Sequence, residues 1–252
     1  AERALILIPR TCLPQFAYLP VRLPALRRPR EGRGSIMPDP NLFRLRVEYC
    51  KKGRLSMLSH LEIARALERA VRRADLPFAV SQGFSPHMKI AFGSALPVGV
   101  GSTCEIFDLQ MTRYVAPEKA LAALRAASVP DLMPYDCRYI GPRDAAASVA
   151  YPVASYQAEL SFALEGGLPL PEEVHVVRKK KEKTLKVADY LVGQLATEGA
   201  MVTFELEAKP TGSLRPDVLL NACIDAFNAT RPEVQEPLRI VSITRTTQRA
   251  SR

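Results

Sequence analysis

The stretch 53–101 constrains the fold most, because it combines a capped helix, a polar loop and a glycine-rich turn. Ser59 and Glu62 have the spacing of a capping box, in which each side chain accepts a hydrogen bond from the other residue's backbone amide. Apolar residues then recur at helical spacing. Pro77 cannot continue a helix. These signals predict a helix that begins after Ser59 and ends near Asp75.

The face of this helix opposite its apolar residues is basic. Arg65, Arg69, Arg72 and Arg73 are spaced so that their side chains form one stripe along the helix. The guanidinium fork matches phosphate oxygens in geometry as well as in charge. The stripe therefore favours a phosphate-binding face. The alternative is a solvated surface on which Glu68 and Arg72 form a weak pair one turn apart.

A polar loop from Ser81 to Lys89 follows the helix. Glycine permits a tight backbone there, and proline holds its neighbour extended. Phe84, an aromatic in this polar loop, either fills the core or offers a face on which a base can stack. The alternative is a turn that satisfies its own hydrogen bonds. Five loop side chains can form hydrogen bonds: Ser81, Gln82, Ser85, His87 and Lys89.

The chain has three histidines, too few and too dispersed for a zinc site. His60, at the first turn of the helix, and His87 are predicted to meet at one end of a sheet. An anion there would also be attracted by Arg54, Lys89 and the free helix amides. The catalytic candidates are His60, His87 and Lys89, acting as general acid and base on an RNA 2′-hydroxyl. The alternative is that both histidines are structural.

Charge and composition set further bounds. The net charge is +9, and residues 1–36 hold seven arginines against two glutamates, so the rest of the chain is only mildly basic. Residues 1–36 are rich in proline and show no sustained period. Met37 follows them directly, which favours a mis-assigned leader and a natural start at Met37. The alternative is a basic disordered arm that touches nucleic acid.

Several classes of protein are disfavoured by the sequence. No apolar run approaches the roughly 18 residues needed to span a bilayer, so we expect no membrane contact. The five cysteines are dispersed, which is typical of a reduced, cytoplasmic protein. Gly99–Gly101 lacks the Lys-Ser/Thr of a phosphate-binding loop, and no dinucleotide fingerprint is present. We therefore expect no cofactor and no metal.

The predicted fold class is α+β. Between residues 43 and 140 the expected order is β-α-β-β-α-β, a ferredoxin-like unit. The part from 155 to 246 resembles a degenerate copy, with a poorly formed first crossover. A basic run at 178–183 is interpreted as a solvated hairpin tip or a phosphate contact. The predicted divisions are a leader at 1–36, a ferredoxin-like domain at 37–141 and a second α+β subdomain at 151–249.

The stretch GRLSMLSHLEIARALERAVRRADLPFAVSQGFSPHMKIAFGSALPVGVGS closely resembles the signature of the radical-SAM-linked domain family. That bacterial family has no established activity and occurs free or fused to cobalamin-binding radical SAM proteins. Weaker resemblances lie at Gly212–Pro216 and Thr244–Thr246. The resemblance implies a radical SAM protein as partner. The three closely spaced cysteines that hold a radical SAM cluster are absent, so this chain is not itself that enzyme.

Three functions remain in view. The first is a non-catalytic accessory module that binds structured, tRNA-like RNA and works with a radical SAM enzyme. The second is a metal-independent RNA endonuclease that uses His60 and His87. The third is a protein-only adaptor for the radical SAM partner. The residues predicted to bind RNA or an anion are Arg54, His60, Arg65, Arg69, Arg72, Gln82, Phe84, His87, Lys89 and Arg215.

Overall fold

The structure, a computed structural model, describes residues 42–178, 181–231 and 236–251. The predicted leader at 1–36 lies outside them. The strands are β1 (Phe43–Lys51), β2 (Ile90–Phe92), β3 (Val100–Met111), β4 (Pro134–Ile140), β5 (Val153–Leu164), β6 (Glu173–Arg178), β7 (Lys181–Lys186), β8 (Leu191–Glu207) and β9 (Ile240–Arg249). The α-helices are α1 (His60–Arg73), α2 (Pro117–Ala127), α3 (Ala147–Ala150) and α4 (Pro216–Ala229). Short 3₁₀ turns are η1 (Gly53–Met57), η2 (Pro130–Leu132) and η3 (Val187–Asp189).

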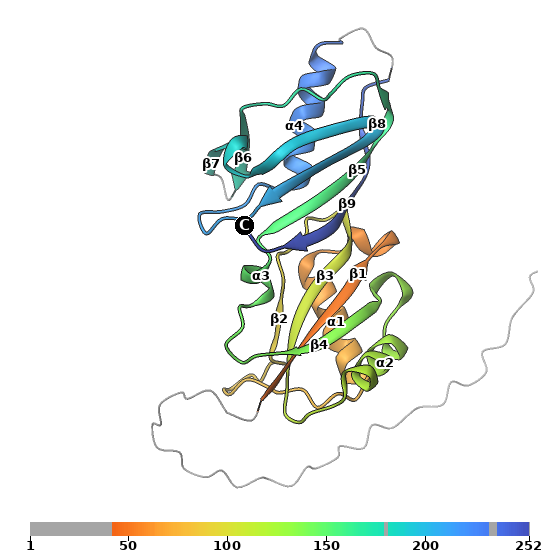
Figure 1. Cartoon of the computed structure of the whole chain (residues 1–252), viewed down its shortest axis with the longest axis vertical. Coiled ribbons are helices and arrows are strands. Elements are labelled where there is room, and N and C mark those ends of the chain that lie inside the picture. The colour runs from red at the N-terminus through yellow and green to blue at the C-terminus, as the bar shows by residue number, and fades with distance from the viewer. Residues whose placement is uncertain (1–41, 179–180, 232–235, 252) are drawn as a thin grey trace, which may run out of the picture. The chain divides into compact units, whose positions relative to one another are not determined.

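One sheet carries most of the strands, in the order β4-β1-β3-β9-β5-β8 (Figure 1). The strand β3 has β1 along one edge. Its other edge is shared by β2, at Phe107–Leu109, and by β9, at Val100–Ser102. The β3–β9 pairing is parallel, and the other pairings are antiparallel. This edge of β3 therefore joins the first half of the described chain to the second.

The first half follows the predicted order, with β4-β1-β3 neighbours and β2 beside β3. Alternate residues of β1 are buried against α1 and α2, which lie on one face of these strands (Figure 1). Leu45 and Val47 of β1, Leu67 of α1 and Leu124 of α2 belong to one buried cluster. The predicted class, α+β, is confirmed. The ferredoxin-like comparison rests on strand order alone and stays an interpretation.

The other face of β1 and β3 is polar and is partly covered by the segment after β4. Asp108 lies 2% exposed between two arginines, 2.7 Å from Arg44 Nη2 and 2.7 Å from Arg46 Nε. Both arginines also donate to backbone carbonyls of the covering segment, at Asp144 and Ala145. Burial opposes the charge on Asp108, yet hydrogen bonds from Arg46 and Arg44 hold its pKa below the ordinary value. These ion pairs fasten the segment to the sheet.

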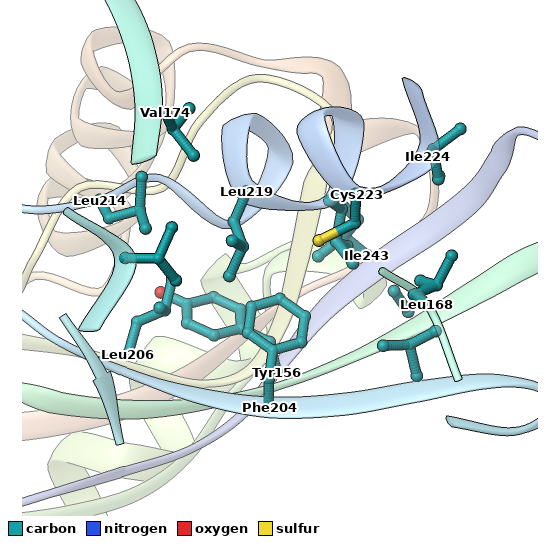
Figure 2. Close-up of a cluster of buried hydrophobic side chains, with 14 of the residues drawn as sticks. Tyr156, Leu168, Val174, Phe204, Leu206, Leu214, Leu219, Cys223, Ile224 and Ile243 are labelled. Atoms are coloured by element: carbon teal, nitrogen blue, oxygen red, sulfur yellow. The ribbon is translucent and has the colours of Figure 1, made fainter. Parts of the chain in front are cut away.

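The second half encloses a separate buried cluster (Figure 2). The rings of Tyr156 on β5 and Phe204 on β8 stack with centroids 5.4 Å apart. Figure 2 shows Leu219 and Cys223 of α4 directed toward this pair, which explains the apolar face of that helix. A two-stranded β6–β7 hairpin stands where the first half has its first crossover helix. The division into domains at 37–141 and 151–249 stays a prediction.

Candidate nucleic-acid interface

The start of α1 is formed as predicted. Ser59 is the N-cap, and both halves of the capping box are present. The Glu62 carboxylate accepts hydrogen bonds from the Ser59 hydroxyl at 2.7 Å and the Ser59 amide at 2.8 Å. These bonds lower the pKa of Glu62. His60 packs edge-on against Phe92, at the end of β2, with ring centroids 5.4 Å apart.

The Ser81–Lys89 loop has a braced base and an exposed tip. The Ser81 amide donates to the His87 carbonyl at 2.7 Å, and the His87 amide donates to the Ser81 hydroxyl at 3.0 Å. Below them the Lys89 amide donates to the Ala79 carbonyl. Phe84, at the tip, is as exposed as in an isolated peptide, at 104%. Of the two readings of Phe84, the structure excludes the one in which it fills the core.

The arginine face of α1 leads toward this loop. Arg65 and Arg69 are exposed. Arg72 lies 3.6 Å from Glu68 and has its guanidinium 5.9 Å from the ring centroid of Phe78, which precedes the loop. Arg73 belongs to the predicted stripe by spacing, but its guanidinium donates to the Ala127 carbonyl at the end of α2. Arg73 therefore ties the two helices together rather than standing free.

The structure does not bring His60 and His87 together, contrary to the prediction from sequence. The start of α1 and the end of β2 lie at the same end of the sheet, where His60 touches Phe92. The loop that carries His87 precedes β2 and is bonded at its base to Gln110, near the other end of β3. The order β-α-β requires this, because the chain must cross back along α1 before β2 begins (Figure 1).

The other residues predicted to bind RNA or an anion are also spread over separate parts of the structure. Exposed Arg54 is in η1, just before α1, and so belongs to the His60 end. Gln82 is exposed in the loop, and Lys89 is half-buried at its base. Arg215 is remote in sequence, at the N-cap of α4, where its guanidinium is paired with Asp217. The basic run at 178–183 lies partly outside the described residues.

Sequence reasoning missed the buried charges. Arg44 and Arg46 alternate with apolar residues along β1, a pattern that predicts solvent exposure, yet they hold Asp108 under a covering segment. Lys51, Glu105 and Arg245 are also almost fully buried. Arg245 likewise lies at an alternating position of a strand, a pattern that does not predict its burial. Nothing in a single sequence indicated which carboxylate it would meet.

Two further observations concern the described residues only. No helix among them is long and apolar enough to cross a membrane. Nowhere in residues 42–178, 181–231 and 236–251 do three or more His, Cys, Asp and Glu side chains gather in a way that would hold a metal ion. The cysteines within the described ranges, Cys50, Cys104, Cys137 and Cys223, are free.

Fold and surface together define a mixed α+β protein that presents a braced, protruding loop beside an arginine-bearing helix. The chain belongs to the bacterial family described as "Uncharacterized protein conserved in bacteria (DUF2344)", whose model matches residues 44–216. That description names no activity and no partner. No curated protein matches the chain.

Among solved structures, the chain is similar to a protein of a Cbf5–Nop10–Gar1 complex, with 12% identity and a TM-score of 0.37. It is also similar to a protein of the archaeal box H/ACA sRNP Nop10–Cbf5 complex, with 13% identity and a TM-score of 0.34. Each alignment covers 81% of this chain and 48% of the other, so the chain spans about half the length of those proteins. Likeness at this level carries no argument about function.

Proposed function

We propose that the Ser81–Lys89 loop and the exposed arginines of α1 form one surface that binds structured RNA. The observation that carries this is Phe84, an aromatic ring held clear of the protein on a loop whose base is fixed by three hydrogen bonds. Proteins recognise unpaired bases by stacking them on such rings, and stacking is worth about 1–3 kcal/mol per base.

The arginines supply the second component of this surface. Arg65 and Arg69 are exposed and one turn apart on α1, and Arg72 contacts the segment that leads into the loop. A phosphate backbone crossing α1 would then place a nucleotide near Phe84. Such contacts give affinity that falls with salt, whereas stacking depends on it little. The surface thus joins a backbone-binding helix to a base-binding ring.

Within this proposal the domain is an accessory module. The sequence resemblance supplies the finer part of the hypothesis, a radical SAM enzyme that acts on the bound RNA. Co-purification of the full chain with a radical SAM protein from a bacterium that encodes both tests this part on its own. If no radical SAM protein co-purifies with the chain, the hypothesis of RNA binding is unaffected.

The nuclease alternative is disfavoured by geometry. General acid–base catalysis needs both groups within hydrogen-bonding reach of one substrate, directly or through one water. His60 and His87 lie at opposite ends of β2. The protein-only adaptor makes a different prediction, because an exposed Phe also suits a protein interface. In that case no RNA binds at physiological salt.

A ring substitution series at position 84 tests the proposal. Structured RNA such as bulk tRNA is titrated into the full chain and followed by fluorescence anisotropy. Phe84→Ala and Phe84→Leu are expected to weaken binding about tenfold, whereas Phe84→Tyr retains it, because only a planar ring stacks on a base. Leu170→Ala, which trims an exposed apolar side chain far along the sequence, is the matched control. Equal affinities across the series would exclude Phe84 as a stacking platform.

A further inference from the structure

A cavity of about 240 Å³ lies where the turn after β2, the start of α4 and the end of β9 meet. Its walls combine apolar residues such as Leu206 and Leu214 with a small set of polar side chains. Figure 2 shows the hydroxyl of Tyr156, which lines the same cavity, directed toward the side where Leu206 and Leu214 lie. Apolar walls with a few polar groups are typical of small-molecule sites.

Arg245 is the polar group that most needs a partner there. It lines the cavity and is 2% exposed. Its Nη1 donates to the Ser94 carbonyl and to Glu105, both at 3.0 Å. Its Nε has no hydrogen-bond partner among the described residues. A buried donor left without a partner costs about 1–3 kcal/mol, so an acceptor in the cavity would relieve a standing penalty.

The buried charges around Arg245 are unbalanced. Lys51 is 3% exposed and Glu105 is 6% exposed, so two buried cations share one buried carboxylate. The Lys51 ammonium donates to the Leu58 carbonyl, a neutral group. Burial lowers the pKa of Lys51, Glu105 acts in the opposite direction, and Arg245 adds to the lowering. Because buried charge is expensive without a counter-charge, this excess favours an anion next to Arg245.

The start of α4 borders the same cavity, which is lined there by Leu214, by the N-cap Arg215 and by Pro216. The N-cap, Arg215, makes no side-chain capping bond. Pro216 has no N–H, so the amides of this 14-residue helix that are available to an anion are those of the residues after it. Two carboxylates at the cavity reduce its net positive charge, although each already has a partner. Asp217 pairs with Arg215 at 2.5 Å, and Glu207, in the cavity wall, accepts from Ser251 at 2.6 Å.

We propose that this cavity binds the oxyanion group of a small molecule, a phosphate ester or a carboxylate, between Nε of Arg245 and the first turn of α4. The cavity is smaller than the roughly 300–1,000 Å³ of drug-sized sites, which suits a small metabolite. Gly212–Pro216 and Thr244–Thr246, which the RNA surface does not use, both contribute residues to it. The site is independent of the proposed RNA surface.

The test uses the full chain and three probes at constant ionic strength: inorganic phosphate, glycerol 3-phosphate and acetate. Calorimetry is expected to show saturable binding of the phosphate probes or of acetate, and the class that binds identifies the source of the oxyanion. Arg245→Lys should weaken it at least tenfold, because lysine keeps a charge for Glu105 but loses the guanidinium fork. Arg239→Lys, at an exposed position just before β9, is the control and should change nothing.

A second variant covers the case in which Arg245→Lys fails to fold. Ala95 is exposed and lines the cavity, so Ala95→Phe should fill the space without removing any of the buried charges. Binding abolished in Ala95→Phe supports the proposal. No saturable binding by any probe, or binding unchanged in Ala95→Phe, overturns it. RNA affinity should be unaltered in both variants, so this result and the RNA result are separable.

Discussion

At the scale of single residues, the backbone and the side chain of His87 have different roles. Its backbone amide and carbonyl bond to Ser81, while its ring is exposed. The loop is therefore braced by main-chain groups of residue 87 that any residue except proline supplies. The imidazole remains free to donate to a phosphate or base beside Phe84.

His87→Ala is accordingly expected to weaken RNA binding while lowering the free energy of unfolding by less than about 1 kcal/mol, as for a surface substitution. Anisotropy with tRNA and urea denaturation measure the two quantities. A large loss of stability, with binding falling in proportion, would instead make His87 a structural pin.

At the scale of elements, α1 was predictable because its signals are local. The capping box, the apolar spacing and Pro77 fix its ends within a few residues, and the helix observed is His60–Arg73. The sequence shows no clear strand pattern in the first part of β8, which begins at Leu191, because that part carries glycines and few buried residues until Val202. Its pairing with β5 is continuous for Met201–Glu207, opposite Val153–Glu159, and after a register shift it resumes with Leu164 opposite Gly199.

The cap of α1 makes a prediction about stability and acid. Ser59→Ala should lower the free energy of unfolding by about 1 kcal/mol, as is usual for a lost N-cap. Because Glu62 has a lowered pKa in the folded protein, its contribution is present above the unfolded pKa and lost as the pH falls. Denaturation at neutral pH and near pH 4 should therefore show a smaller difference between Ser59→Ala and the parent at the lower pH. If the difference in stability between Ser59→Ala and the parent is the same at both pH values, the loss does not arise from the bonds to Glu62.

The covering segment after β4 depends on Asp108. Asp108→Asn leaves Arg44 and Arg46 buried without a counter-charge, and breaking such a group costs about 3–5 kcal/mol. The folded pKa of Asp108 is depressed, so its stabilisation is fully present above the unfolded pKa of about 4 and is lost as the pH falls through the lower, folded pKa. Urea denaturation should show the variant's deficit shrinking in acid. Asp136→Asn, an exposed carboxylate on β4, is the control.

At the scale of the whole molecule, sequence reasoning predicted the order of elements in the first half but wrongly placed His60 beside His87. Joining His60 to His87 ignored that α1 carries the chain back across the sheet before β2. The pairing of β3 with β9, which creates the cavity around Arg245, connects residues more than a hundred positions apart, and no local pattern predicts such a contact. The separation of His60 from His87 and the cavity around Arg245 both depend on how the strands are ordered and paired, which local sequence propensity does not reveal.

The salt dependence of RNA affinity tests the central claim most directly. The logarithm of the binding constant is measured against the logarithm of salt concentration for the parent and for Arg65→Ala plus Arg69→Ala. The control is Arg231→Ala plus Arg239→Ala, which removes the same charge from exposed positions in the second half. If α1 holds the phosphate backbone, the first pair flattens the slope by about one to two units and the control leaves it unchanged. Equal slopes for both pairs, or no RNA binding by the parent, would contradict the account.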